Sequence, residues 1–177
     1  VDDHDLVRTG LRCMLEDFPE FSLVGEASSG EDALILGRKL KPDVVLMDIK
    51  MPGIGGYEAT RKLRLAEPTV IVLVVTTCDN DIYPARLLGV GASGYLTKNA
   101  SMNEMIQAIK AVAGGQRYIS PEIASRLALR HVANNQETPF DKLSERELQV
   151  MIMITSGTKA QAIAERLHLS PKTVNSY

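Results

Sequence analysis

Short apolar runs alternate with amphipathic stretches over the first 113 residues of the chain. Residues 44–47 and 70–75 are uninterrupted apolar runs of strand length, a pattern typical of strands that are buried on both faces. Between such runs, apolar residues recur every three or four positions, which is the spacing of one helical face. The strands predicted in this way are Val1, 21–27, 43–48, 70–76 and 95–98, and the predicted helices are 6–18, 30–40, 57–66, 84–90 and 102–113.

This alternation predicts βαβ units, and therefore a five-stranded parallel sheet covered by helices. The chain begins at Val1 rather than at a methionine, so the first strand is expected to be truncated. Open sheets of this kind bind their ligands at the carboxyl ends of the strands, which directs attention to the residues that follow each strand.

The periodicity changes after residue 113. Residues 114–142 are predicted to be a linker, with a possible helix at 121–131 and a polar stretch at 131–139. Residues 143–177 then show only helical spacing, and they end inside a predicted helix, so this second domain is also expected to be truncated.

Three cap signals mark the helix starts of the second domain. They are the capping box Ser144-x-x-Glu147, Thr158, and Ser170 followed by Pro171. Short helices joined by tight turns predict an all-α helix-turn-helix domain. A plain helical bundle remains the alternative, because basic and acidic residues nearly balance over 143–177 and charge does not decide between the two.

Bulk composition narrows the class of protein without identifying it. Of the 177 residues, 45% are hydrophobic and 24% are charged, as expected for one or two globular domains, and the net charge of -2 gives no overall attraction to nucleic acid. Cys13 and Cys78 form no metal-ligand or CxxC pattern, which argues against a zinc site or a disulfide framework and favours a reducing cytoplasm. The longest apolar run is far shorter than the roughly 20 residues that span a bilayer.

Polar side chains follow the predicted strands in turn. They are Asp2 and Asp3 after the first strand, Asp48 after the third, Thr76 after the fourth and Lys98 after the fifth. Three carboxylates can hold Mg²⁺ while one attacks phosphorus, and a hydroxyl and an ammonium can bind the phosphoryl oxygens. Each residue has an ordinary explanation by itself, such as a loop cap, a strand-end hydroxyl or a surface lysine. Their occurrence at successive strand ends favours phosphoryl transfer.

The motifs around these residues resemble those of one protein family. They are Val-Asp-Asp-His at 1–4, Leu-Met-Asp-Ile-Lys-Met-Pro-Gly at 46–53, Thr76 and Gly-Tyr-Leu-Thr-Lys at 94–98. Together they resemble the receiver domain of two-component response regulators over residues 1–113. The resemblance implies a flavodoxin-like (CheY-like) α/β fold. It also implies that a sensor histidine kinase delivers a phosphoryl group to Asp48.

The same resemblance implies a metal site and a switch. Mg²⁺ would be held by Asp3, Asp48 and the backbone carbonyl of Lys50, with Asp2 assisting.

Thr76 and Lys98 would contact the phosphoryl group, and Tyr95 would be the switch aromatic. A dianion at Asp48 would draw in Thr76, and Tyr95 would fill the space that Thr76 leaves. Thr77 is the next residue, so it remains an alternative to Thr76.

Two further motifs, Leu-Ser-Glu-Arg-Glu-Leu at 143–148 and Leu-Ser-Pro-Lys-Thr-Val-Asn-Ser-Tyr at 169–177, resemble the LuxR-type helix-turn-helix. The whole chain resembles the NarL/FixJ class of response regulators, and within it the GacA/UvrY group. In this class the start of the last helix enters the major groove. The resemblance places near DNA the residues Lys159, Lys172, Thr173, Asn175 and Ser176, whereas Val174 is expected in the core.

The interpretation that unites these features is a cytoplasmic, phosphorylation-switched transcription factor without dedicated catalytic turnover. It would bind double-stranded promoter DNA as a homodimer when phosphorylated. Two alternatives remain. One is a phosphatase with Asp48 as its nucleophile, although Lys50 stands where such enzymes often carry a second acid. The other is a DNA-binding regulator that does not need phosphorylation, against which the complete acidic set argues.

Overall fold

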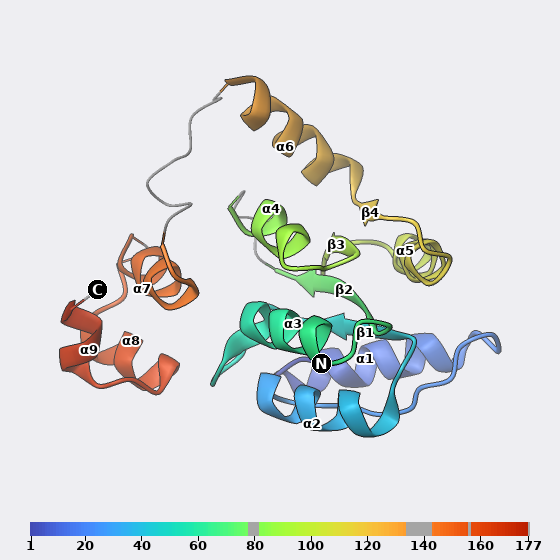
Figure 1. The fold of residues 1–177 in the computed structure, drawn as a ribbon, viewed down its shortest axis with the longest axis horizontal. Helices are drawn as coiled ribbons and strands as arrows, with labels where there is room; N and C mark the ends of the chain where they lie inside the picture. The colour runs from blue at the N-terminus through green and yellow to red at the C-terminus, as the bar shows by residue number, and fades with distance from the viewer. Residues whose placement is uncertain (78–81, 134–142, 156, 177) are drawn as a thin grey trace. The chain divides into compact units, whose positions relative to one another are not determined.

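The computed structural model describes residues 1–77, 82–133, 143–155 and 157–176, which fall into two compact units, 1–130 and 131–177. The first unit is built on a parallel sheet of four strands in the order β1-β2-β3-β4 (Figure 1). The strands are β1 (Val44–Met47), β2 (Ile71–Thr76), β3 (Gly94–Thr97) and β4 (Tyr118–Ile119). The helices are α1 (Asp5–Glu16), α2 (Gly30–Leu40), α3 (Gly55–Ala66), α4 (Ile82–Gly89), α5 (Met102–Ala113) and α6 (Pro121–Ala133).

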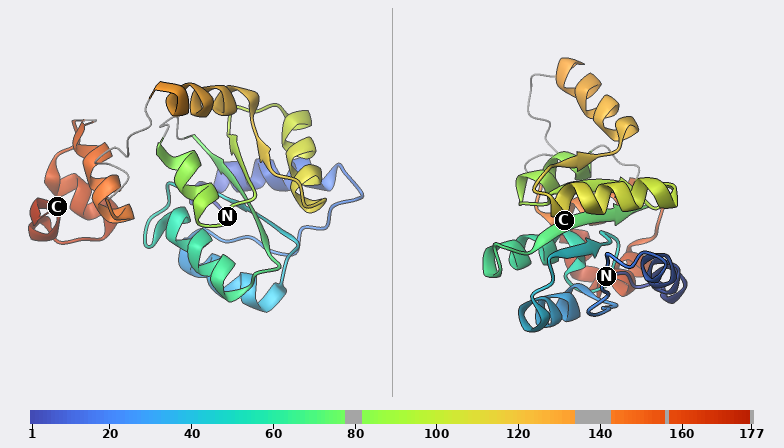
Figure 2. Two further views of the ribbon diagram at one scale, coloured as in Figure 1. Left: turned by 45° about the horizontal axis from the view of Figure 1, so that its top comes forward. Right: turned by 90° about the vertical axis from the view of Figure 1, so that its right-hand side faces the viewer.

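The apolar run that forms β2 is buried on both faces of the sheet, as its sequence predicts: every residue of β2 after Ile71 is buried. Leu73 and Val75 face a core cluster that α1 and α5 complete with Met14, Met105 and Ile109. On the opposite side, α3 contacts β2 and α4 contacts β3. The left view of Figure 2 shows α1 and α5 on one side of the strands and α3 and α4 on the other.

The strand register brings the carboxyl ends of neighbouring strands to one edge. Met47 pairs with Val74, and Thr76 pairs with Thr97. Asp48 directly follows β1, and Lys98 directly follows β3. Polar residues from three strand ends therefore lie along the same edge, as the parallel arrangement requires.

The fold class is confirmed, but the set of strands differs from the prediction. Residues 21–27 form no strand, and Val1 is not part of one either. Val1 nevertheless lies beside β1, because its nitrogen donates to the Leu46 carbonyl at 2.7 Å and its carbonyl accepts the Asp48 N–H at 2.9 Å. A cavity of about 450 Å³ runs between residues 21–27 and β1. The Asp2 N–H donates to the Ala27 carbonyl at 3.1 Å, and a single contact of this kind at one end of the stretch does not make a strand ladder.

The strand β4 was not predicted. It is two residues long, and it pairs with β3 at Gly94 and Tyr95. A strand of this length has no recognisable period, so only the tertiary contact with β3 reveals it.

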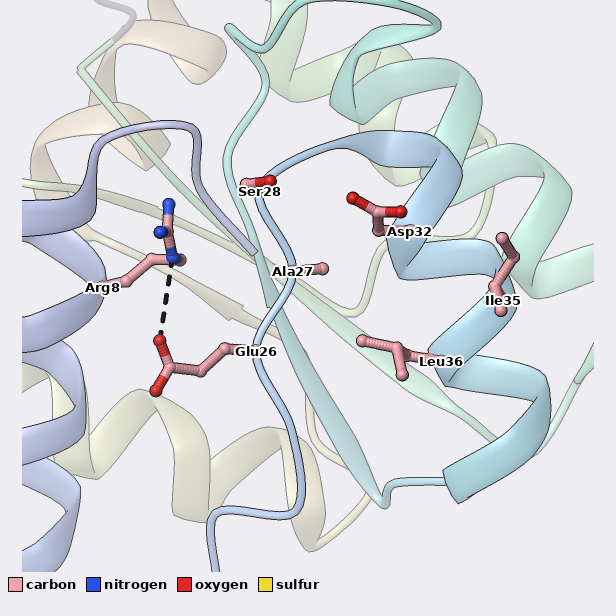
Figure 3. Close-up of a pocket in the computed structure, with 7 residues that line it drawn as sticks. All are labelled: Arg8, Glu26, Ala27, Ser28, Asp32, Ile35 and Leu36. Atoms are coloured by element: carbon pink, nitrogen blue, oxygen red, sulfur yellow. Dashed lines mark ion pairs between the residues drawn. The ribbon is translucent and has the colours of Figure 1, made fainter.

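Ion pairs join α1 to the 21–27 stretch. Arg8 Nε lies 3.7 Å from Glu26 Oε2, and Arg12 Nη1 lies 3.1 Å from Glu26 Oε1. A pocket of about 360 Å³ borders this contact, and Figure 3 shows Arg8 and Glu26 on one side of it and Asp32 and Leu36 of α2 on the other. The 21–27 stretch is therefore joined to α1 by ion pairs between side chains, and not by a strand ladder.

The second unit consists of α7 (Glu145–Thr155), α8 (Ala160–Leu167) and α9 (Pro171–Ser176). Among its described residues, one core cluster consists of the buried side chains of Val150, Ile163, Ala164, Leu167 and Val174, and Leu148 is buried as well. The burial of Val174 confirms the core position predicted for it.

Two of the three predicted helix caps are present. Ser144 N–H donates to the Glu147 carboxylate at 2.6 Å, and Glu147 N–H donates to Ser144 Oγ at 3.3 Å, so the capping box is confirmed. Ser170 Oγ accepts the Thr173 N–H at 3.0 Å. The predicted cap at Thr158 is wrong, because α8 begins one residue later and its N-cap position is Lys159.

Helix α6 lies where the sequence had left a helix possible. Residues 134–142 of the predicted linker, which include most of its polar stretch at 131–139, lie outside the described residues, as do Cys78 and Tyr177. Within the ranges that the structure describes, no helix combines the length and the apolar character that a membrane crossing requires.

Candidate functional site

Asp48 stands at the carboxyl end of β1, and its side chain is 2% exposed. Its Oδ1 accepts the N–H groups of Ile49 at 2.7 Å and Lys50 at 3.3 Å. The turn that follows passes very close to Asp48: a Cβ atom on Gly56 would lie 1.8 Å from the Asp48 carbonyl oxygen. Glycine at position 56 therefore allows α3 to begin directly beside the acidic residue.

A lysine links Asp48 to a second buried carboxylate. Lys98 Nζ lies 2.6 Å from Asp48 Oδ2 and 2.6 Å from Asp2 Oδ2, and the Asp2 side chain is also 2% exposed. The backbone N–H of Lys98 donates to the Thr76 carbonyl at 2.9 Å, which holds the end of β3 against β2. One ammonium thus compensates two buried carboxylates that would otherwise repel each other.

The two carboxylates also decide the protonation of Lys98. Burial by itself lowers the pKa of Lys98, because it penalises the charged ammonium. The hydrogen bonds to Asp2 and Asp48, with the charges of these two residues, outweigh burial and raise the pKa above its ordinary value. Lys98 therefore carries a positive charge at neutral pH, at a place where it can also bind a phosphoryl oxygen.

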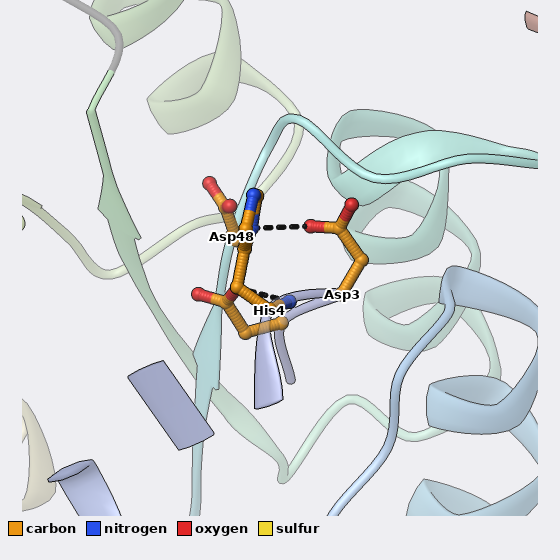
Figure 4. Close-up of side chains that lie close together, drawn as sticks. Asp3, His4 and Asp48 are labelled. Atoms are coloured by element: carbon orange, nitrogen blue, oxygen red, sulfur yellow. Dashed lines mark hydrogen bonds and ion pairs between the residues drawn. The ribbon is translucent and has the colours of Figure 1, made fainter. Parts of the chain in front are cut away.

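The third carboxylate, Asp3, is 30% exposed. Its Oδ1 lies 3.0 Å from Nδ1 of His4, which in turn lies 3.3 Å from Asp2 Oδ1. Figure 4 shows the side chains of Asp3, His4 and Asp48 gathered around one point. One ligand atom from each of Asp2, Asp3, His4 and Asp48 can be chosen so that all lie within 4.8 Å of one another. This spacing suits one divalent cation, and carboxylate oxygens are the hard donors that Mg²⁺ prefers, so the acidic pocket is compatible with Mg²⁺.

The remaining predicted site residues lie around this pocket. Thr76 ends β2, Tyr95 lies on β3, and both are completely buried. Thr77, the alternative hydroxyl, is exposed. The Lys50 side chain is exposed, and its backbone lies beside Asp48, to which the Lys50 N–H donates. The functional roles of these residues stay predictions.

In the second unit, the residues predicted to meet DNA are at the surface. Lys159 is exposed before α8, and Lys172, Asn175 and Ser176 are exposed on α9. Thr173 is half-buried because its side chain takes part in the cap, with Oγ1 at 2.7 Å from Ser170 Oγ.

Two residues that contact the carboxylates or the backbone of this pocket, His4 and Arg8, were given no role from the sequence. His4 contacts two of the carboxylates, and Arg8 Nη1 donates to the Asp2 carbonyl at 2.6 Å. Helical spacing could have indicated that these two residues lie on the same side of α1, because Arg8 comes one turn after His4, at the start of the helix.

Models of known families match both units. The model described as the response regulator receiver domain matches residues 1–110, and the model for bacterial regulatory proteins of the luxR family matches residues 141–177. The chain belongs to the response regulators of the LuxR family. It is therefore a transcriptional regulator of a two-component system, which receives its signal from a histidine kinase. It is not an enzyme with a dedicated turnover reaction, and this corrects the phosphatase alternative.

Known relatives of this response regulator cover the whole chain. Response regulator GacA of Pseudomonas aeruginosa is 58% identical over 178 residues, which is 100% of this chain and 83% of the relative. Response regulator UvrY of Escherichia coli is 51% identical over 178 residues, which is 100% of this chain and 82% of the relative. The predicted resemblance to the GacA/UvrY group is thus confirmed.

Solved structures of a more distant relative show the same architecture. RcsB of Salmonella enterica serovar Typhimurium, bound to the promoter rprA with the phosphomimetic BeF3-, is 26% identical with a TM-score of 0.68. The match covers 99% of this chain and 84% of that chain. Another structure contains two RcsB dimers bound to two parallel DNAs, with a TM-score of 0.67 and 26% identity over 99% of this chain and 84% of that chain.

Proposed function

We propose that Asp48 is the phosphoacceptor of this response regulator. A carboxylate oxygen of Asp48 attacks the phosphorus of a phosphohistidine on the kinase. The new O–P bond forms as the N–P bond breaks, and the released imidazole takes up a proton. The observation that carries this proposal is the contact of Asp48 with Lys98 at the strand edge, beside the carboxylates of Asp2 and Asp3.

The other residues of the pocket hold the reacting group. Asp3, Asp48 and the Lys50 carbonyl bind Mg²⁺, with Asp2 assisting. The ion supplies charge neutralisation for the phosphoryl oxygens. Lys98 binds one phosphoryl oxygen, and its move toward the phosphoryl group is favoured because the ammonium already stands 2.6 Å from Asp48. Thr76 donates its hydroxyl to another phosphoryl oxygen.

A movement of Tyr95 transmits the effect of phosphorylation from the pocket to β4 and α6. The Tyr95 carbonyl accepts the Ser120 N–H at 3.3 Å, and the Ser120 carbonyl accepts the Ala124 N–H at 2.9 Å in the first turn of α6. Tyr95 also pairs with Ile119 in β4. A shift of Tyr95 toward the space beside Thr76 therefore acts on the strand that leads into α6. This contact chain supports Tyr95 as the switch residue.

Phosphorylation promotes pairing of two copies, and the paired modules bind two half-sites on promoter DNA. Pairing raises affinity through effective concentration, without a new contact to DNA. Lys159 and Lys172 meet phosphates, while Thr173, Asn175 and Ser176 lie near the bases. The RcsB dimers bound to DNA support this arrangement. The protein acts in the cytoplasm, where it can both accept the phosphoryl group from the kinase and bind the promoter.

The first experiment measures the intact mass of the full chain after incubation with a small phosphodonor and Mg²⁺. Wild type and Asp43→Asn are expected to gain one phosphoryl group, and Asp48→Asn none. Asp43 is the matched control because it flanks the opposite end of β1. An adduct that persists in Asp48→Asn, or that is absent from wild type, overturns the assignment.

A second experiment tests the output. Beryllium fluoride with Mg²⁺ is expected to increase dimerisation and promoter affinity together in wild type, and to change neither in Asp48→Asn. Equal promoter affinity with and without the analogue would instead favour the alternative of a regulator that does not need phosphorylation.

A further inference from the structure

Arg8 reaches from α1 to the backbone of the acidic pocket. Its Nη1 donates to the Asp2 carbonyl at 2.6 Å, its Nη2 bonds the Asp5 carboxylate, and its Nε faces Glu26 at 3.7 Å. Only 17% of the side chain is exposed. The guanidinium therefore contacts a carboxylate of its own helix, Asp5, and a carboxylate of the 21–27 stretch, Glu26. It also donates a hydrogen bond to the backbone of the loop that carries Asp2 and Asp3.

The Asp2 carbonyl belongs to the peptide that joins Asp2 to Asp3. The rest of Asp2 is fixed from elsewhere: its N–H donates to the Ala27 carbonyl at 3.1 Å, and its carboxylate is bound by Lys98. Asp3 is the more exposed residue, and among the described residues its carboxylate contacts only His4. The orientation of the Asp2–Asp3 peptide therefore decides where the Asp3 carboxylate points, and Arg8 fixes that peptide.

We propose that Arg8 is a positioning residue for the metal site: by holding the Asp2–Asp3 peptide it aims Asp3 at the cation and sets the Mg²⁺ affinity of the pocket. This inference rests on the proposed function of the pocket. Residues that orient metal ligands typically change metal affinity by about 10- to 100-fold when they are replaced.

Electrostatics alone predicts the opposite sign. Arg8 is a cation near the pocket, so its removal without any change in geometry would strengthen Mg²⁺ binding. A loss of affinity on removal therefore indicates positioning rather than charge.

Arg12 provides the matched control. It lies one turn further along α1 and pairs with the same Glu26, at 3.1 Å, but in the described part of the chain it does not bond to the Asp2–Asp3 peptide. Arg8→Met and Arg12→Met each remove one guanidinium and one ion pair between α1 and residues 21–27. Arg8→Met also removes the ion pair with Asp5 inside α1, and it alone takes away the donor to the Asp2 carbonyl.

The experiment titrates the unphosphorylated full chain with Mg²⁺ by calorimetry at fixed ionic strength, after circular dichroism without Mg²⁺ has checked folding. Arg8→Met is expected to bind Mg²⁺ about tenfold more weakly, Arg12→Met within about twofold of wild type, and Arg8→Lys between the two. In phosphodonor assays, the half-saturating Mg²⁺ concentration should rise by the same factor in Arg8→Met. The rate at saturating Mg²⁺ should change little.

Unchanged or tighter Mg²⁺ binding in Arg8→Met, or an equal loss in Arg12→Met, overturns the role of Arg8. If Arg8→Met does not fold, Arg8→Lys decides the question: weaker binding with a normal maximal rate supports the role, and wild-type affinity overturns it. Wild type that binds no Mg²⁺ refutes the proposed function itself, whereas normal wild-type binding with an unaffected Arg8→Met refutes only this inference.

Discussion

In the first unit two of the three carboxylates of the pocket are buried: Asp2 and Asp48 are each 2% exposed and share Lys98 as their counterion. In the second unit Lys172, Asn175 and Ser176, which are predicted to meet DNA, are exposed on α9, and six side chains are buried among the residues of this unit that the structure describes. Buried charges are part of what holds the receiver together, so changes there alter stability and function at once. Exposed residues on α9 can change DNA affinity with little effect on folding.

The largest effect is expected from Gly56→Ala in the receiver. The new Cβ would lie 1.8 Å from the Asp48 carbonyl oxygen, so the start of α3 must move away from the pocket. The free energy of unfolding should fall by about 3 kcal/mol or more, and phosphorylation should be lost. Urea denaturation and the intact-mass assay measure the two effects.

Gly10→Ala is the control for that substitution. Nothing lies within 4 Å of a Cβ at Gly10, which is on the exposed side of α1. Alanine should raise the free energy of unfolding by about 0.5–1 kcal/mol, because glycine is the weaker helix former. Destabilisation by Gly10→Ala comparable to that by Gly56→Ala would mean that crowding at Asp48 is not the cause.

Removal of the shared counterion comes next. Lys98→Gln leaves the carboxylates of Asp2 and Asp48 without their common cation, and we expect a loss of about 3 kcal/mol in unfolding free energy at neutral pH without divalent cations. Urea titrations of both proteins measure it. A loss below about 0.5 kcal/mol would show that the pair is solvated more than its burial indicates.

The same variant tests the pH dependence. The pKa of Lys98 in the folded protein is raised above its ordinary value of 10.5. Its contribution is therefore fully present below about pH 10.5 and is lost as the pH rises through the folded-state pKa. The stability difference between wild type and Lys98→Gln should be constant from pH 7 to 9 and shrink at higher pH. A difference that instead grows above pH 10.5 contradicts the raised pKa.

A smaller and separable effect is expected on α9. Lys172→Gln should lower promoter affinity by roughly five- to tenfold and reduce the slope of log affinity against log salt by about 1, because one phosphate contact is lost. The unfolding free energy should change by less than about 0.5 kcal/mol. Lys39→Gln removes the same charge from an exposed position of α2 and should leave the salt slope unchanged. Fluorescence anisotropy at several salt concentrations measures both variants.

The smallest effect compares equivalent helix caps in the two units. Ser144→Ala removes the cap of α7, and Ser29→Ala removes the cap of α2, where Ser29 Oγ accepts the Asp32 N–H at 3.1 Å. Each should cost about 0.5–1 kcal/mol in urea denaturation. Only Ser144→Ala should also weaken promoter binding, since its unit has the smaller core. Equal promoter affinity in both variants would show that the second unit is more stable than its core suggests.

Much of the site could be predicted because strand ends are visible in the sequence. An apolar run that ends on Asp48, and another that ends on Thr76, place both residues at one edge of any parallel sheet. The pairing of Lys98 with both Asp2 and Asp48 could not be predicted, because it depends on how far β3 reaches past β2. The contact between Arg8 and the Asp2 carbonyl could not be predicted either, because it joins a helix side chain to the backbone of a loop.

The sequence by itself determined the α/β class, the positions of α2 and α5, the capping box at Ser144 and the family, since each depends on periodicity or local motif. The tertiary structure decided the rest. Residues 21–27 have strand composition but no ladder, because a strand exists only with a hydrogen-bonded neighbour. The two residues of β4 have no pattern yet form a strand, because β3 presents an edge to them. Backbone pairing and shared counterions join residues far apart in the chain, and no local pattern records them.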